Sequence, residues 1–292
     1  MSDLEWIVAR SSAVPDLKLP RHVAVIMDGN GRFARRHARA RTWGHRQGAK
    51  ALKRILEAMH ALSIPYLTVF GFSMENWHRP KEEVASLMHL LVHYLKSESL
   101  QLKERNVQLR VIGRLDLLPD FVREELEKTL KLLIGCDGMQ LTLALSYGAR
   151  DEITLAAQAL ARAAKAGDID PESIEPEDIE RLLGTCGMPD PDLLIRTSGE
   201  KRLSNFMLWQ LAYTEFYFSS VCWPEFDARF LWKALLSYHK RQRRFGCVQK
   251  HLCDPLVVMS PEETITPPTQ GYMGVDMIVE NSRNITSGIE TS

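Results

Sequence analysis

The sequence lacks the features that mark several broad classes of protein. No segment approaches the roughly 20 consecutive apolar residues that a bilayer-spanning helix needs. The first ten residues carry acids and no continuous apolar core, so a secretion signal is not expected. The five cysteines form no CxxC pair, which argues against both a disulfide framework and a zinc ribbon. We therefore expect a soluble protein of the reducing cytoplasm.

Neither sign of charge is in excess, since 37 basic residues balance 37 acidic ones. General attraction to nucleic acid is not indicated, so an anionic ligand would have to be recognised by a local group of cations. Apolar residues are abundant: with 292 residues and 45% hydrophobic content the chain can bury a large core. From about Cys247 onward, prolines, serines and threonines follow one another without periodicity, which predicts a mobile tail over residues 247–292.

Strand-like and helix-like segments alternate along the chain, which predicts an α/β fold with a mostly parallel central sheet flanked by helices. One of the helices carries an apolar stripe at helical spacing that either packs on the sheet or lines a lipid-sized cavity. The stripe consists of Val84, Leu87, Leu91, Tyr94 and Leu95. The expected strands are His22–Asp28, Tyr66–Phe72, Val107–Ile112, Met139–Ser146 and Leu193–Arg196, and the expected helices are His45–Leu62, Lys81–Glu104, Pro119–Ile134 and Ala149–Ala164.

The stretch from His22 to Lys50 combines a strand end, a glycine-rich turn and a run of cations. The turn Asp28-Gly29-Asn30-Gly31 ends the strand, and its glycines let backbone N–H groups approach an anion. A helix starting near Arg32 would add its amino-terminal amides, and no acidic residue occurs between Arg32 and Lys50. This composition favours a site for a metal-bound diphosphate, with Asp28 placed to share Mg²⁺ with phosphate oxygens. The alternatives are a simple turn and a solvated, arginine-rich helix face.

A second polar cluster follows the second expected strand, at the end of the sheet where parallel strands bind ligands. Ser73 and Asn76 can hydrogen-bond a diphosphate or hold a proton in transit. Trp77 can cover an apolar chain, and Arg79 can pair with phosphate. A helix cap beside a buried tryptophan is the alternative interpretation.

A third cluster follows the last expected strand. Arg196, Arg202 and Ser204 offer forked and hydroxyl donors that suit phosphate oxygens. Further on, Glu215 lies inside an aromatic strand, where a charge is costly unless it is paired or metal-bound. The sequence leaves open whether Glu215 forms a salt bridge or binds a metal.

Together the clusters resemble the cis-prenyltransferases, in particular the bacterial undecaprenyl diphosphate synthases, across roughly Leu19 to Gly246. The resemblance implies a catalytic domain over residues 19–246 after an amino-terminal segment of residues 1–18. It also implies a sheet-and-helix fold with an apolar tunnel, usually as a homodimer. The matching motifs, in the family's order, are HVAVIMDGNGRFA, RTWGHRQGA, FSMENWHRP, DLLIRTSGEKRLSNFMLWQLAYTEFYF, WPEF and RQRRFG.

The activity that the resemblance implies is a Mg²⁺-dependent, sequential cis-condensation of isopentenyl diphosphate with an allylic diphosphate. The product would be a long-chain Z-polyprenyl diphosphate of undecaprenyl class that is delivered to a membrane. The enzyme would then be cytoplasmic or peripheral at the membrane and would bind no nucleic acid. Trans-type prenyl synthases use paired aspartates for the same task, and the absence of an Asp-Asp dipeptide discriminates against them.

The resemblance also assigns roles residue by residue. Asp28 resembles the essential carboxylate that acts with Mg²⁺, and Asn76, with Ser73, resembles the pair that removes the proton. Glu215 resembles a metal ligand that can reach from the partner subunit, and Arg244 belongs to a motif that reaches the neighbouring active site. The substrate-binding residues implied in this way are Gly29, Asn30, Gly31, Arg32, Phe33, Arg41, His45, Ser73, Met74, Glu75, Trp77, Arg79, Arg196, Arg202, Leu203, Ser204 and Arg244.

The sequence departs from the family pattern at four positions without losing a catalytic group. Phe33 replaces the commoner tryptophan, Ser146 stands where asparagine usually precedes Tyr-Gly, and Lys201 occupies a variable site. Gly71 occupies a position that usually holds alanine. By resemblance, Gly71 and Met139 are candidates for lining the far end of the tunnel, where product length would be set.

Two other functions are considered. A noncatalytic subunit of the same fold would support a partner synthase, but Asp28, Asn76 and Arg202 argue against it. RNA binding through the basic run from Arg32 to Arg46 would need sequence-independent phosphate contacts, and the zero net charge of the chain argues against that.

Overall fold

The computed structural model describes residues 2–241. Its six-stranded sheet is parallel throughout and has the strand order β3-β4-β2-β1-β5-β6. This confirms the predicted fold class, and the last strand is the aromatic one that contains Glu215. The strands are β1 (His22–Ile26), β2 (Tyr66–Ser73), β3 (Gln108–Ile112), β4 (Gln140–Tyr147), β5 (Leu193–Arg196) and β6 (Glu215–Phe218).

Eight α-helices and several short 3₁₀ turns connect the strands within residues 2–241. Helix α4 has the predicted bounds, whereas α3 begins four residues earlier than expected. Helices α1 and α8 were not predicted from the sequence. The helices are α1 (Asp3–Ser12), α2 (Asn30–Arg36), α3 (Arg41–Ala61), α4 (Lys81–Glu104), α5 (Asp120–Leu132), α6 (Ala149–Ala166), α7 (Pro176–Leu182) and α8 (Ala228–His239).

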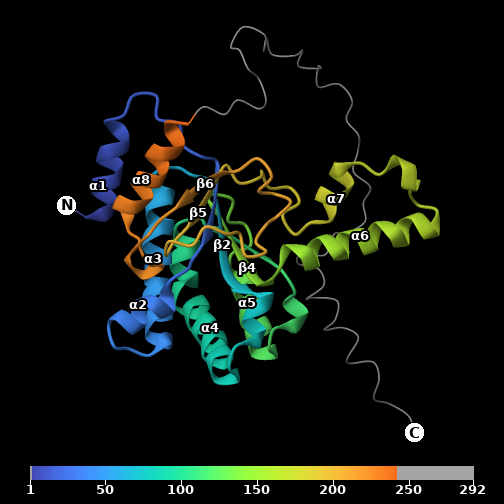
Figure 1. The fold of residues 1–292 in the computed structure, drawn as a ribbon, viewed down its shortest axis with the longest axis horizontal. Helices are drawn as coiled ribbons and strands as arrows, with labels where there is room; N and C mark the ends of the chain where they lie inside the picture. The colour runs from blue at the N-terminus through green and yellow to red at the C-terminus, as the bar shows by residue number, and fades with distance from the viewer. Residues whose placement is uncertain (1, 242–292) are drawn as a thin grey trace. The chain divides into compact units, whose positions relative to one another are not determined.

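The central strand β1 is buried on both faces, as expected for a parallel sheet covered on both sides. Because side chains alternate along a strand, Val23 and Val25 point into the larger core and Ala24 and Ile26 into a smaller one. Helices α3, α4 and α8 contribute to the larger core. Helix α1 joins it through Ile7, which is fully buried. Figure 1 shows α1 and α8 side by side next to α3, and α5 beside α4.

The order of the strands places the chain's change of direction beside β1. From β1 the chain builds β2, β4 and β3 on one side and then crosses to β5 and β6 on the other. In open parallel sheets, ligands bind outside the carboxyl ends of the strands at such a point. The three polar clusters of the sequence follow β1, β2 and β5, so the topology brings them to one edge of the sheet.

The predicted tail, residues 247–292, and Arg244 lie outside the described residues. Within residues 2–241, no helix is long and apolar enough to cross a membrane.

Candidate active site

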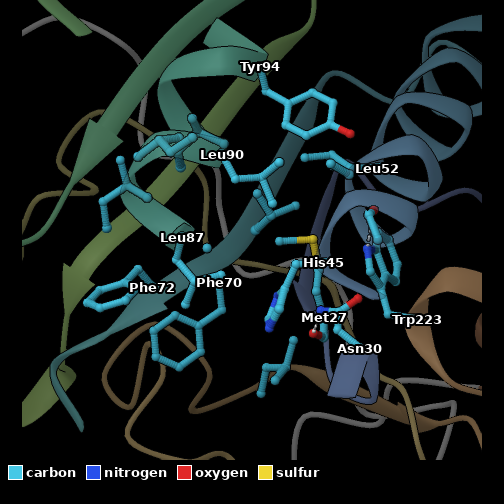
Figure 2. A pocket seen from close by; sticks show the side chains of 18 of the residues that line it. Met27, Asn30, His45, Leu52, Phe70, Phe72, Leu87, Leu90, Tyr94 and Trp223 are labelled. Atoms are coloured by element: carbon cyan, nitrogen blue, oxygen red, sulfur yellow. Dashed lines mark hydrogen bonds between the residues drawn. The ribbon is translucent and has the colours of Figure 1, made fainter. Parts of the chain in front are cut away.

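A cavity of about 760 Å³ opens at the carboxyl ends of β1, β2 and β5 and continues between α3, α4 and the sheet. Asp28, Ser73 and Arg196 line its polar end. Figure 2 shows Met27, Asn30 and His45 close together in one part of the cavity, and Tyr94 and Leu52 in another. The body of the cavity is apolar and is lined by Leu52, Leu56, Val69, Leu87, Met88, Leu91, Leu95, Leu141, Leu143 and Leu145.

The apolar stripe on α4 is part of this wall. Of the predicted stripe, Leu87, Leu91, Tyr94 and Leu95 line the cavity, whereas Val84 packs against the core. The lining extends to Arg105, just after α4, so the cavity follows about 27 Å of the helix at 1.5 Å per residue. The stripe therefore lines a cavity large enough for an extended apolar chain.

Asp28 is held at the polar end by a nearly buried arginine. The Nη2 atom of Arg196 donates to Oδ2 of Asp28 over 2.9 Å, and the Gly29 N–H donates to Oδ1 over 2.6 Å. The backbone carbonyl of Asp28 accepts from the Thr197 hydroxyl at 2.7 Å and from the Trp223 N–H at 2.9 Å. The Arg196 side chain is 4% exposed and that of Asp28 29% exposed. The carboxylate is thus fixed in place while remaining accessible from the cavity.

Further cations surround this pair. The Nη1 atom of Arg196 donates to the Ser204 hydroxyl over 2.8 Å and to the backbone carbonyl of Arg202. The Arg202 side chain pairs with Glu200, which also pairs with Arg32 at 2.8 Å. Arg32 lies 3.5 Å from Asp28 Oδ1 as well. Glu200 therefore acts as a shared counterion that an incoming phosphate group could replace.

Three polar atoms at this end are buried without a hydrogen-bond partner: Asn30 Oδ1, His45 Nε2 and Arg196 Nε. All three side chains line the cavity. An unsatisfied buried polar atom costs about 1–3 kcal/mol, so three of them together indicate that a polar ligand completes the site.

His45 is neutral at neutral pH. Its pKa is lowered to about 4, chiefly by burial and then by the charges of Arg79 and Arg41, while Glu83 acts in the opposite direction. A neutral imidazole can present either a donor or an acceptor at Nε2, depending on its tautomer. A bound anion would favour the protonated form and so strengthen this contact.

The second cluster forms a capped 3₁₀ turn, Met74–His78, as the alternative interpretation expected, but Trp77 is only partly buried. The Ser73 N–H donates to Asn76 Oδ1 over 3.2 Å, and both residues line the cavity. The indole N–H of Trp77 donates to the Ser146 hydroxyl over 2.8 Å. The cap therefore fixes Asn76 at the edge of the cavity, where it remains available to a ligand.

Two contacts of the second cluster were not predicted from the sequence. Glu75 Oε1 accepts from Asn205 Nδ2 at 3.1 Å, which ties the second cluster to the third. Burial raises the pKa of Glu75, but hydrogen bonds, including those from Asn205 and Ser73, outweigh it and lower the pKa overall. Glu83 on α4 pairs with both Arg41 and Arg79, at 3.3 and 3.1 Å. The polar residues Asn205 and Glu83 gave no sequence signal of their own, because their role depends on distant partners.

Several predicted site residues lie beside the cavity rather than on its wall. Gly29 has a φ of +102°, and a Cβ there would lie 2.7 Å from Ser198 Oγ, so the turn requires glycine. The Phe33 ring stacks on Trp43 with 5.2 Å between centroids. The residues that do not line the cavity are Gly29, Gly31, Arg32, Phe33, Arg41, Met74, Trp77, Leu203 and Glu215.

Glu215 is not brought to Asp28 within one chain. It is the first residue of β6 and is in register with Leu193, which pairs with Val23. Asp28 instead follows the other end of β1. Because Val23 and Ile26 are three residues apart, Glu215 lies about 10 Å before the end of β1 along the strand direction. A metal shared by both carboxylates would therefore have to take one of them from another subunit.

The donor set at the polar end fits a hard divalent cation that is held jointly with phosphate. Within residues 2–241 no group of three or more histidines, cysteines and carboxylates could hold a metal by itself. Mg²⁺ prefers oxygen ligands and is commonly bound by one or two carboxylates together with substrate phosphates. The Asp28 carboxylate and the unpartnered Asn30 Oδ1 supply oxygens of this kind.

Comparison with known proteins agrees with this geometry. Residues 26–246 match the family described as "Putative undecaprenyl diphosphate synthase". The isoprenyl transferase of Geobacter sulfurreducens is 50% identical over 233 residues, which cover 80% of this chain and 94% of that protein. The isoprenyl transferase of Chlorobaculum tepidum is 46% identical over 234 residues, covering 80% and 88%.

Two solved structures share the fold. Lavandulyl diphosphate synthase from Lavandula x intermedia, in complex with dimethylallyl diphosphate, has a TM-score of 0.76 at 37% identity and covers 78% of this chain and 98% of its own. A probable undecaprenyl diphosphate synthase from Campylobacter jejuni has a TM-score of 0.64 at 35% identity, covering 78% and 99%.

The parallel sheet, its flanking helices and these similarities define a prenyl-transferring enzyme. The chain belongs to the undecaprenyl diphosphate synthase family of cis-prenyltransferases.

Proposed function

We propose that this enzyme joins isopentenyl diphosphate repeatedly to an allylic diphosphate, with Mg²⁺, and makes a long-chain Z-polyprenyl diphosphate of undecaprenyl class. The observation that carries the proposal is the division of one cavity into two parts. One end holds cations and unpartnered polar atoms, and the adjoining wall, which follows about 27 Å of α4, is mostly apolar. A diphosphate with a growing hydrocarbon tail has the same division.

The polar end suits the bond cleavage that starts each condensation. As the allylic C–O bond breaks, negative charge develops on the leaving diphosphate, and prepositioned donors stabilise it. Arg32 and His45 lie around Asp28 on the side of the glycine turn, so we assign them to the allylic diphosphate. A bound Mg²⁺ would neutralise part of the same charge, and Asp28 would hold it.

Isopentenyl diphosphate is assigned to the third cluster. Arg196, Arg202 and Ser204 line the cavity together, and Arg196 and Ser204 are hydrogen-bonded to each other. When the new carbon–carbon bond forms, C2 of isopentenyl diphosphate loses a proton. Ser73 and Asn76, on the cavity wall, supply hydroxyl and amide oxygens that would position that proton for transfer to an oxygen of the released diphosphate.

We further propose that the active enzyme is a homodimer. In the described sheet β6 is an edge strand, and its residues Phe216, Tyr217 and Phe218 are only half-buried. A symmetric pairing over this edge would cover the aromatic side chains. It would also allow Glu215 of one subunit to approach Asp28 of the other. Because a product of this class is strongly apolar, we also propose that it passes to a membrane and that the enzyme works in the cytoplasm or at the membrane surface.

The proposed reaction is tested by incubating the full chain with Mg²⁺, isopentenyl diphosphate and a series of allylic diphosphates, followed by mass analysis of the products. We expect a ladder that ends in long-chain polyprenyl diphosphates and that disappears with a chelator. Absence of elongation with every allylic diphosphate would contradict the proposal.

The shared site is tested separately by mixing two inactive variants, Asp28→Asn and Glu215→Gln. If each site takes one carboxylate from each subunit, a mixed dimer contains one intact site, and activity returns on mixing. If both carboxylates act within one chain, mixing restores nothing.

A further inference from the structure

The distant half of the cavity is bordered by charged side chains as well as by leucines. Lys53 on α3 and Glu98 on α4 line it, as do Gln101 and Arg105 further along. Lys53 lies further along α3 than His45 does, and Glu98 and Arg105 lie further along the chain than Glu83, which pairs with Arg41 at the start of α3. The lining thus becomes charged on one side at the depth where a long chain would end.

These charges connect α3 to α4 by two ion pairs. Lys53 Nζ lies 2.8 Å from Glu98 Oε2, and Arg105 Nη2 lies 2.8 Å from Glu57 Oε1. Nearer the polar end, the Tyr94 hydroxyl donates to a backbone carbonyl of α3 over 3.0 Å, and Figure 2 shows its ring reaching toward α3. All three contacts follow the same order along both helices. The two ion pairs, Lys53–Glu98 and Glu57–Arg105, form a charged seam along one side of the cavity.

The side chains of the first ion pair face both the cavity and the solvent. Lys53 and Glu98 are 35% and 26% exposed, yet both also line the cavity. An apolar chain that pressed against this pair would remove water from two charges and give them nothing in return, which is unfavourable. The floor of the cavity is different, because Leu102, Leu109 and Leu141 line it.

We propose that the seam formed by Lys53–Glu98 and Glu57–Arg105 sets the maximum length of the product. The growing tail fills the apolar body until its end meets the ion pairs. Beyond that point a further unit gains little from burial, so the chain leaves rather than elongates. This inference rests on the elongation activity proposed above and adds the residues that limit it.

The test replaces the first pair by apolar residues of similar reach. In the double variant K53L/E98L we expect products at least one isoprene unit longer than those of the unchanged protein. The matched control is K96L/E125L, which removes an ion pair of 3.6 Å between α4 and α5 that does not line the cavity. The reversed pair K53E/E98K keeps a charge pair at the seam and should restore the original product length.

A binding measurement checks the same limit without catalysis. The probes are linear alkyl diphosphates of increasing length, used below their micelle concentrations. Each further buried CH₂ should strengthen binding about fourfold until the chain meets the seam, after which affinity levels off. In K53L/E98L the levelling should occur at a longer chain.

The outcomes separate the two proposals. If the unchanged protein elongates no allylic diphosphate, the proposed function is contradicted. The alkyl diphosphate series then still tests whether the seam limits chain length, because it needs no catalysis. If K53L/E98L and the unchanged protein share one product length and one levelling point, the seam does not limit the chain.

Discussion

The two parts of the cavity are built in different ways. The polar end comes from three short stretches of sequence, each directly after a strand, and its atoms are fixed by specific contacts such as Arg196 to Asp28 at 2.9 Å. The apolar body takes one side chain at a time from two helices and three strands. Single changes should therefore remove activity at the polar end but only alter the product at the apolar body.

The largest effect should follow from removing the charge of Asp28. Asp28→Asn keeps the size of the side chain and an acceptor for Arg196, but it weakens the hold on a metal and its diphosphate. A loss of several kcal/mol corresponds to at least about a thousandfold in turnover. Asp116→Asn is the control, since Asp116 also pairs with an arginine, Arg114, but does not line the cavity. Near-normal turnover by a folded Asp28→Asn protein would contradict the assignment.

A smaller effect is expected from Arg202→Ala. A charge-assisted hydrogen bond is worth about 1.5–3 kcal/mol, so the KM for isopentenyl diphosphate should rise about 10- to 100-fold, with less change for the allylic substrate. Steady-state kinetics with each substrate varied in turn measures this difference. Arg181→Ala serves as the control, because Arg181 is similarly exposed and paired but lies outside this cavity. Equal changes for both substrates would show that Arg202 does not distinguish them.

Acid should weaken the fold through two buried histidines. Burial lowers the pKa of His22 and of His45 to about 4, against about 6.5 in an unfolded chain. As the pH falls, the unfolded chain takes up protons first, so stability is lost between about pH 6.5 and 4. Between pH 7 and pH 5, each histidine should lower the free energy of unfolding by about 2 kcal/mol.

Urea unfolding at both pH values measures this dependence. His45→Gln should remove the part of this pH dependence that comes from His45 and leave the part that comes from His22. His60→Gln should remove neither part, because His60 is exposed. Equal pH dependence in the unchanged protein and His45→Gln would mean that His45 is not buried as a neutral group.

The smallest effect on rate should come from the apolar body. Gly71 lines the cavity, but it lies two residues before Ser73, where the apolar body begins, and not at the far end as expected. A Cβ there would lie 3.0 Å from Leu145 Cδ2, so Leu145 must shift slightly. Gly71→Leu should shorten the products while the first condensation changes less than about fivefold. Mass analysis of the products decides the point, and an unchanged distribution would show that this position does not restrict the chain.

The structure corrects the expectation for Met139. It is buried in the core and does not line the cavity. It precedes Leu141 by two residues, on the same face of the strand, and the cavity reaches only as far as Leu141. A shorter side chain at Met139 could deepen the floor, but the residue does not touch the present cavity.

The contrast between the two parts also explains what could be predicted from the sequence. The polar clusters were visible because each is continuous, and the stripe on α4 because helical spacing repeats. The pairing of Lys53 with Glu98, and of Glu75 with Asn205, could not be predicted, since each depends on how distant segments pack. Helix α1 did carry a local signal, the capping box of Ser2 and Glu5, that the composition of the segment obscured.

A crystal structure of the full chain with Mn²⁺ and a long-chain allylic thiodiphosphate that resists cleavage would show where both parts of the substrate bind. We expect the diphosphate among Asp28, Arg196 and His45, and the hydrocarbon tail between α3 and α4 over the leucines of the sheet. A tail bound outside this cavity, or a diphosphate bound away from Arg196, would contradict this expectation.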